Sequence, residues 1–237
     1  EAPLVGLVAT KRRGKQYRSG TYEPWRDPVP DHPLPFQVEC AESREHQQFA
    51  KTLDRLSRFS FTVGNKVVSL HSGDECMPRM LETIRWARHS ITLTSYIFEA
   101  IGIGAEFVEE LAKAAKRGVQ VRVMVDDAGT RYSRPPVIDA LRKAGVNARR
   151  FMPNRMVLRL ITMNLRNHRK IMVVDGAIAF TGGINIREGN MLSRTPAHPV
   201  HDLHFEVCGP IVAQIQRVFA EDWEFCTGEA LEGPLWF

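Results

Sequence analysis

The hydrophobic pattern switches repeatedly between a helical period and a strand period from residue 64 onward, and this alternation restricts the fold more than any other feature. Apolar residues recur at helical spacing in three segments, and a short apolar run rich in β-branched residues follows each of them. The predicted helices are 77–88, 104–117 and 136–143, and the predicted strands are 91–97, 119–125 and 146–151. This order favours an α/β layered fold with a largely parallel sheet.

The later part of this region adds a different connection. Two apolar runs, 170–174 and 178–181, flank an Asp-Gly pair at 175–176, which is typical of a tight hairpin turn. A strand over 203–208 and a helix over 211–225 follow. A hairpin joins antiparallel strands, so the predicted central sheet is mixed, mostly parallel and flanked by helices.

The region before residue 64 has another composition. Residues 1–39 are rich in proline and basic residues and predict an extended arm, and residues 40–63 carry apolar positions among many charges, which predicts an N-terminal helix. Residues 64–237 form a single predicted lobe. The basic run 11–15 could touch anionic lipid, or it could be a solvated tail.

The net charge and the cysteine spacing indicate which partners and which stabilising sites to expect. The formal net charge is +5, which favours an anionic partner such as a phospholipid surface or nucleic acid without choosing between them. Four cysteines lie far apart without a C-x-x-C pair, so neither a disulfide framework nor a cysteine zinc site is expected. No run approaches the roughly 18 apolar residues that a membrane span needs, so the chain itself is expected to be soluble.

A histidine and a lysine two residues apart form the most informative pair. Side chains alternate faces along a strand, so His168 and Lys170 are expected on the same side while Arg169 points away. An imidazole beside an ammonium suits a phosphoryl group, because the imidazole can attack phosphorus and the ammonium can neutralise its oxygens. Such a pair is also common on surfaces without any function.

Other candidates follow along the chain. A Gly-Gly pair that ends at Gly183 lets backbone approach a ligand, and Asn185 can donate to a phosphate oxygen, although a turn and a helix cap are the ordinary alternatives. Asp202 could orient His168 as a carboxylate orients a catalytic imidazole. Asp175, at the far end of the same strand, is better suited to a structural contact than to attack.

Two patterns superficially suggest metals. In a strand, His201 and His204 point to opposite faces and cannot share a zinc ion, so the spaced histidines beginning at His198 predict no zinc site. The pair Asp126 and Asp127 at a strand end could hold magnesium, but acidic strand ends are common without metal.

The combined pattern resembles the phospholipase D superfamily, whose signature is H-x-K-x4-D followed by G-G-x-N. In this chain it reads His168, Lys170 and Asp175, then Gly183 and Asn185. The resemblance covers about residues 64–228. Further matches resemble the N-terminal half of a bacterial cardiolipin synthase, and these are Asn65 after Gly64, Tyr96-Ile97-Phe98-Glu99, Arg117-Gly118-Val119, Asn167, and Asp202-Leu203-His204 before Gly209-Pro210.

The resemblance assigns roles to these residues. It implies a phospholipase D-like lobe in which His168 forms a phosphohistidine and Lys170 and Asn185 hold the non-bridging oxygens. Asp202 would support His168, and Asp175, counted with the catalytic motif, would serve mainly structure. Gly183 and Glu99 are expected to support the site. No metal or cofactor is implied.

Three functions follow as hypotheses. The first is a phosphatidyl transferase of the cardiolipin synthase type acting on phosphatidylglycerol, associated with the cytoplasmic face of a bacterial inner membrane. The second is a phospholipase D or endonuclease that uses water, and the third is a non-catalytic lobe that binds anionic lipid. The superfamily chemistry uses two H-x-K motifs, and of eight histidines only His168 has lysine two residues on. The second motif is therefore expected from a C-terminal lobe or from a homodimer mate.

Overall fold

The computed structural model describes residues 48, 49, 52, 54, 56, 59–132, 135–151 and 166–237. Contacts within the chain divide it into two units, Glu1–Gly64 and Asn65–Phe237. In the first unit, the described positions from 48 to 56 are helical, and the Phe61 amide donates to the Asp54 carboxylate at 2.9 Å. The arm predicted over 1–39 lies outside the described residues.

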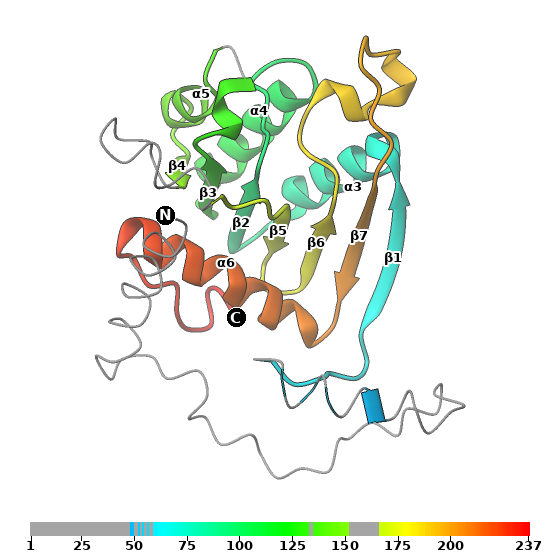
Figure 1. Ribbon diagram of the computed structural model, residues 1–237. Coiled ribbons are helices and arrows are strands. Elements are labelled where there is room, and N and C mark those ends of the chain that lie inside the picture. Colours follow the sequence, from blue (N-terminus) through cyan, green and yellow to red (C-terminus); the bar gives the residue numbers. More distant parts are fainter. Residues whose placement is uncertain are drawn as a thin grey trace, which may run out of the picture. The chain divides into compact units, whose positions relative to one another are not determined.

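Seven strands form one sheet in the described part of the second unit. They are β1 (Lys66–His71), β2 (Ser90–Ser95), β3 (Gln120–Asp126), β4 (Asn147–Phe151), β5 (Ile171–Val174), β6 (Ile178–Gly182) and β7 (Leu203–Cys208). Their order across the sheet is β1-β7-β6-β5-β2-β3-β4, with β2 near the centre (Figure 1).

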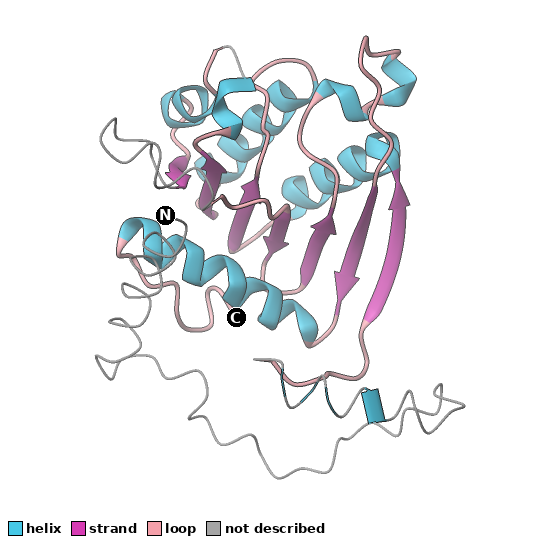
Figure 2. Cartoon of the chain, viewed as in Figure 1, coloured by secondary structure: helices cyan, strands magenta, loops and turns pink. Residues whose placement is uncertain are grey.

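Four α-helices cover the two faces of this sheet. Three of them, α3 (Ser72–Trp86), α4 (Ile103–Lys116) and α5 (Val137–Lys143), lie on one face, and α6 (Ile211–Thr227) crosses the other face (Figure 2). No described helix combines the length and the apolar character needed to cross a membrane.

The alternation of side chains along β2 explains how one strand serves both layers. All six of its residues are buried. Ile91 and Leu93 belong to the core under α3, α4 and α5, whereas the Thr92 hydroxyl donates to Gln216 of α6 at 2.7 Å. A strand covered on both faces reads as a continuous apolar and β-branched run, which is why the sequence predicts it well.

The mixed α/β architecture with flanking helices is confirmed, but the expectation of a mostly parallel sheet is wrong. Only β2–β3 and β3–β4 pair in parallel, and the other four neighbouring pairs are antiparallel. Helical crossovers connect β2, β3 and β4, whereas β5 turns directly into β6 as the Asp-Gly pair predicts. Strand β1 was not predicted, because at this sheet edge five of its six residues are exposed.

The directions of the strands bring distant segments together at one edge of the sheet. The carboxyl ends of β2, β3 and β6 and the amino ends of β5 and β7 meet at the upper edge in Figure 1. Every segment that carries a predicted phosphate-binding side chain reaches this edge.

Candidate active site

His168 and Lys170 lie beside each other at the amino end of β5. The Lys170 ammonium is 3.0 Å from Nδ1 and 3.2 Å from Nε2 of His168, and it also donates to the His168 carbonyl at 2.7 Å. The sequence predicts that both residues belong to a strand. In the structure they precede it, because β5 begins only at Ile171. The predicted proximity nevertheless holds, since both side chains turn to the same side of the segment.

Two buried carboxylates hold the segment that carries His168. The backbone amide of Asn167 donates to Asp126 at 2.8 Å, and its side-chain amide donates to Asp222 of α6 at 2.9 Å. Arg169 forms an ion pair with the same Asp222 carboxylate. These contacts replace strand pairing, so the backbone next to His168 is fixed from β3 on one side and from α6 on the other.

The electrostatic environment favours a neutral imidazole next to a cation. Desolvation and the positive charge of Lys170 lower the pKa of His168 below its usual value, while Asp126 opposes this shift. Burial lowers the pKa of Lys170 to about 8, and Asp202 opposes that shift. At neutral pH the imidazole is therefore free to act as a nucleophile, and the ammonium keeps most of its charge.

An aromatic ring from the end of β2 lies beside His168 and Lys170. The Tyr96 ring centroid lies 4.8 Å from that of His168, with 50° between the ring planes, and 5.5 Å from the Lys170 ammonium. The ring face attracts the cation and limits the rotation of the imidazole. Tyr96 thus restricts the positions of both reactive groups.

The loop after β6 brings Asn185 to the same edge. The Asn185 side-chain oxygen accepts a hydrogen bond from the Ile97 amide at 3.0 Å. The neighbouring Ile186 pairs with Phe98 as an isolated parallel bridge. The side-chain oxygen of Asn185 is thus bound to the backbone that follows β2. Its side-chain nitrogen remains able to donate a hydrogen bond to a phosphate oxygen.

Asp202 contacts the site differently from the expectation. Its carboxylate accepts the Leu203 amide at 2.7 Å and lies directly against the α-carbon of Gly183, where any side chain would collide with it. No hydrogen bond joins Asp202 to His168 among the described residues. Instead, the charge of Asp202 acts on Lys170, which lies on the same face of the sheet.

Glu99 supports the loop next to the site. Its carboxylate accepts the Glu188 amide at 2.9 Å, and Arg187 approaches it at 3.9 Å. Glu188 in turn accepts the Ile103 amide at 2.9 Å at the start of α4. Glu99 therefore fixes the connection between β6 and β7, and no described contact joins it to His168 or Lys170.

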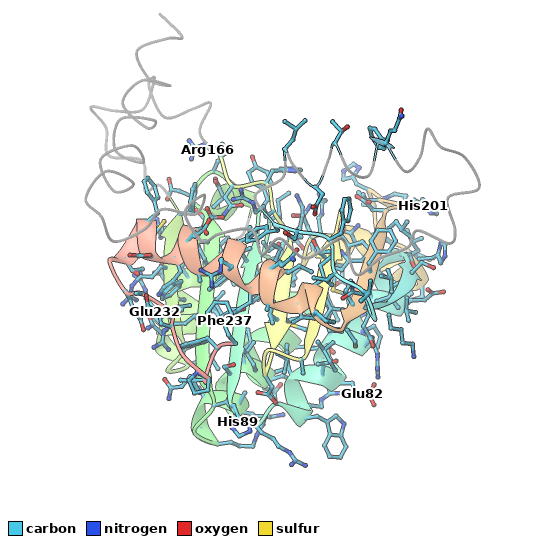
Figure 3. All side chains as sticks on the ribbon, turned by 90° about the horizontal axis from the view of Figure 1, so that it is seen from below. Glu82, His89, Arg166, His201, Glu232 and Phe237 are labelled. Carbon is cyan, nitrogen blue, oxygen red and sulfur yellow. The ribbon has the colours of Figure 1, made fainter. Side chains whose placement is uncertain are left out.

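Asp175 lies at the opposite end of β5 from His168. Its carboxylate accepts the amides of Arg88, His89 and Ser90 at 2.9, 2.7 and 2.9 Å. Figure 3 labels His89 at the opposite edge of the view from Arg166 and His201. Asp175 therefore lies away from the other residues of the motif that it is grouped with. The three hydrogen bonds agree with the structural role expected for it.

Replacing Asp175 tests this structural role. We expect Asp175→Ala to lower the free energy of unfolding by about 2–4 kcal/mol, because three backbone amides lose their acceptor. Asp175→Asn should lower it less, since the amide oxygen still accepts and asparagine tolerates the positive φ of 51° found here. Urea unfolding measures both, with the exposed Glu232→Ala as a control. A stable but inactive Asp175→Ala variant would contradict the assignment.

The histidines and aspartates that superficially suggest metals differ in their surroundings. His204 is only 1% exposed whereas His201 is exposed, so the two side chains lie in different surroundings. Asp126 accepts the amides of Asn167 and Ala128, both at 2.8 Å, and therefore anchors backbone.

Four residues of the site were not assigned to it from the sequence. In the sequence, Tyr96 and Asn167 stand out only as matches to a family pattern, Asp126 only as a candidate magnesium ligand, and Asp222 not at all. Asp222 stands in a helix far along the chain, and only its burial inside an otherwise amphipathic helix gives a signal, since a buried carboxylate needs a partner.

The chain is similar in sequence to one family of lipid-synthesising enzymes. A family described as "Cardiolipin synthase, PLD-like domain" matches residues 80–223, which is more than half of the chain. Cardiolipin synthase A of Pseudomonas syringae is 33% identical over 197 residues, covering 82% of this chain and 41% of that protein. Cardiolipin synthase 1 of Bacillus anthracis is 36% identical over 159 residues, covering 67% and 31%. The chain thus spans well under half of either relative.

Solved structures share the fold. The phospholipase D family member Nuc from Salmonella typhimurium superposes with a TM-score of 0.54 at 17% identity, covering 71% of this chain and 99% of that one. NucT from Helicobacter pylori gives a TM-score of 0.52 at 14% identity, covering 68% and 98%. At these identities the similarity concerns the fold alone.

Proposed function

Because this chain belongs to the family of cardiolipin synthases with a phospholipase D-like domain, we propose that it carries the nucleophilic half of a phosphatidyl transferase. The observation that supports this proposal most is the contact between the His168 imidazole and the Lys170 ammonium, at 3.0 and 3.2 Å, in a setting that keeps the imidazole neutral. The relatives' names point to cardiolipin as the product, so the proposed reaction moves a phosphatidyl group between two phosphatidylglycerol molecules.

The proposed first step is attack by a His168 ring nitrogen on the substrate phosphorus. The bond from phosphorus to the glycerol head-group oxygen breaks, and a phosphohistidine forms. Lys170 and the Asn185 amide nitrogen stabilise the negative charge on the non-bridging oxygens. In the second step, the hydroxyl of another phosphatidylglycerol attacks phosphorus, so that cardiolipin and glycerol are the products and His168 is regenerated.

The leaving alkoxide needs a proton in the first step, and the attacking hydroxyl must lose one in the second. A single general acid and base can do both. We propose that this group is a histidine of a second H-x-K motif, supplied by another part of a longer protein or by a second copy of the chain. The substrate places the reaction at a membrane surface, so association with a bacterial inner membrane is part of the proposal.

Product analysis tests the function. The chain is incubated with phosphatidylglycerol in detergent micelles over a range of chain concentrations, and lipids are separated by chromatography and identified by mass spectrometry. Cardiolipin with an equal amount of glycerol is the expected result, and a specific activity that rises with chain concentration indicates that a second copy completes the site. Phosphatidic acid alone would show hydrolysis instead, and cut DNA without lipid products would contradict lipid transfer. If the chain alone gives no product, the same assay is repeated with a longer protein that supplies the second motif, and no product from that protein either would leave only a binding role.

The rate of transfer should depend on pH through both groups of the pair. Attack needs neutral His168, so the rate rises with pH through a pKa below the usual 6.5. Charge stabilisation needs protonated Lys170, so the rate falls above about pH 8. Rates measured from pH 5 to pH 10 should give a bell-shaped profile with its maximum between these values.

Lys170→Arg identifies the alkaline limb. A guanidinium does not titrate in this range, so the variant should retain a reduced rate whose fall near pH 8 has disappeared. If the alkaline limb stays near pH 8 in this variant, another group is responsible for it.

A further inference from the structure

His204 is a buried histidine that the proposed mechanism does not use. It lies on β7, is 1% exposed, and pairs in register with Gly182 of β6 on one side and Leu70 of β1 on the other. Neither ring nitrogen has a hydrogen-bond partner among the described residues. A buried imidazole in a strand without such a partner is costly, so its presence beside the site needs a reason.

The sheet register places His204 on the same face as Lys170. Met172 of β5 pairs with Phe180 of β6, and Phe180 pairs with Glu206 of β7. Two residues toward the site, Gly182 pairs with His204, and Lys170 directly before β5 continues the register of β5 to the same level. These three positions form one row across adjacent strands on one face of the sheet.

The middle position of this row has no side chain. A Cβ atom on Gly182 would lie 2.8 Å from Nδ1 and 2.6 Å from Cα of His204. The His204 ring therefore occupies the space over Gly182 that a side chain would otherwise fill. Lys170 stands on the other side of Gly182, directly before the start of β5.

The charges around the row agree with this placement. Lys170 and Asp202 both act on His204, and burial lowers the pKa of His204 to about 4, so its ring is neutral at physiological pH. The Lys170 ammonium lies against His168 and the Tyr96 ring, and its charge interacts with Asp202 and His204. A neutral ring beside the ammonium excludes water without adding repulsion.

We propose that His204 is a positioning residue for Lys170, because its imidazole fills the space over Gly182 and keeps the ammonium against His168. This inference rests on the proposed function for its catalytic consequence, but its structural part concerns Lys170 alone. Removal of the ring lets water and the lysine side chain enter this space. The Lys170 pKa should then rise toward the usual lysine value, and the contact with His168 should weaken.

The titration of Lys170 measures this effect without any substrate. The full chain is labelled with ¹³C-lysine, and the Lys170 side-chain signal is assigned by its absence in Lys170→Arg. Its pKa should rise by about one unit in His204→Ala. In His204→Gln, whose neutral side chain fills similar space, the pKa should stay within about 0.3 units of the native value. If His204→Ala gives no cooperative thermal transition, His204→Thr, which suits a strand, takes its place.

The pH profile of lipid transfer is the second readout. The alkaline limb should move upward by the same amount in His204→Ala, with a rate at pH 7 about tenfold lower, and His204→Gln should restore most of the rate. An unchanged Lys170 pKa in a folded His204→Ala variant would overturn the proposal and leave His204 as packing only. If Lys170 titrates as expected while neither the native chain nor a longer protein that supplies the second motif forms product, His204 positions Lys170 but the proposed function fails.

Discussion

His168→Ala should abolish lipid transfer, with a loss of about 10⁴-fold or more in kcat. The ring forms the covalent bond to phosphorus in the proposed first step, and alanine leaves Lys170 and Asn185 without this nucleophile. The variant should still bind phosphatidylglycerol micelles, because the ammonium and the amide donor remain. Quenched reactions with ³²P-labelled lipid should show an acid-labile label on the native chain and none on the variant.

A second histidine of the same chain provides the control. His89 is exposed at the opposite edge of the sheet, and its described hydrogen bonds come from its backbone: the amide donates to Asp175 and the carbonyl accepts from the Gln120 amide. His89→Ala preserves that amide and should keep the native rate. Residual transfer by His168→Ala above about one hundredth of the native rate would show that another nucleophile is used.

Asp222→Ala should lower both stability and kcat, although Asp222 contacts no substrate. The change leaves the buried Asn167 amide and Arg169 without their acceptor, so we expect a loss of about 2–4 kcal/mol in the free energy of unfolding. The segment that carries His168 then loses its attachment to α6. A displacement of the nucleophile by about 1 Å costs on the order of 100-fold in rate, so kcat should fall by about 10- to 100-fold with little change in KM.

Two variants separate position from charge. Asp222→Asn keeps an oxygen for Asn167 and loses mainly the ion pair with Arg169, whose side chain is 45% exposed and therefore contributes little. Its kcat should lie near the native value. Glu224→Ala, at an exposed position of the same helix, controls for changes in α6 itself. Full kcat in a folded Asp222→Ala variant would mean that Asn167 and Asp126 hold His168 unaided.

The sequence predicts those parts of the molecule that local patterns encode. The central strand β2 and the helices around it follow from apolar periodicity, and the hairpin between β5 and β6 follows from an Asp-Gly pair. The same reasoning brings His168 and Lys170 together, because they are two residues apart. Strand β1 cannot be predicted in this way. It is an edge strand with mostly exposed residues, and it lacks the continuous apolar run that is typical of a buried strand.

The surroundings of the pair depend on tertiary structure and could not be derived in the same way. Asp126 and Asp222 reach the His168 segment from a strand end and a helix that lie on either side of it in the sequence. Asp202 is expected beside His168, but its carboxylate lies against Gly183, and its charge acts on Lys170. No spacing in the sequence distinguishes these alternatives, because they differ only in how strands align.

Strands β5, β6 and β7 follow one another in the chain and are neighbours in the sheet, and this has an evolutionary consequence. The proposed nucleophile His168, the Lys170 ammonium and the proposed amide donor Asn185 all lie within residues 167–204, so a single recombination or duplication of this stretch would transfer them together. The two carboxylates that anchor it, Asp126 and Asp222, lie outside on either side. A transplanted copy therefore keeps its reactive groups but becomes competent only in a recipient whose strand end and helix already offer matching acidic residues. That requirement restricts which lobes can exchange this stretch with one another.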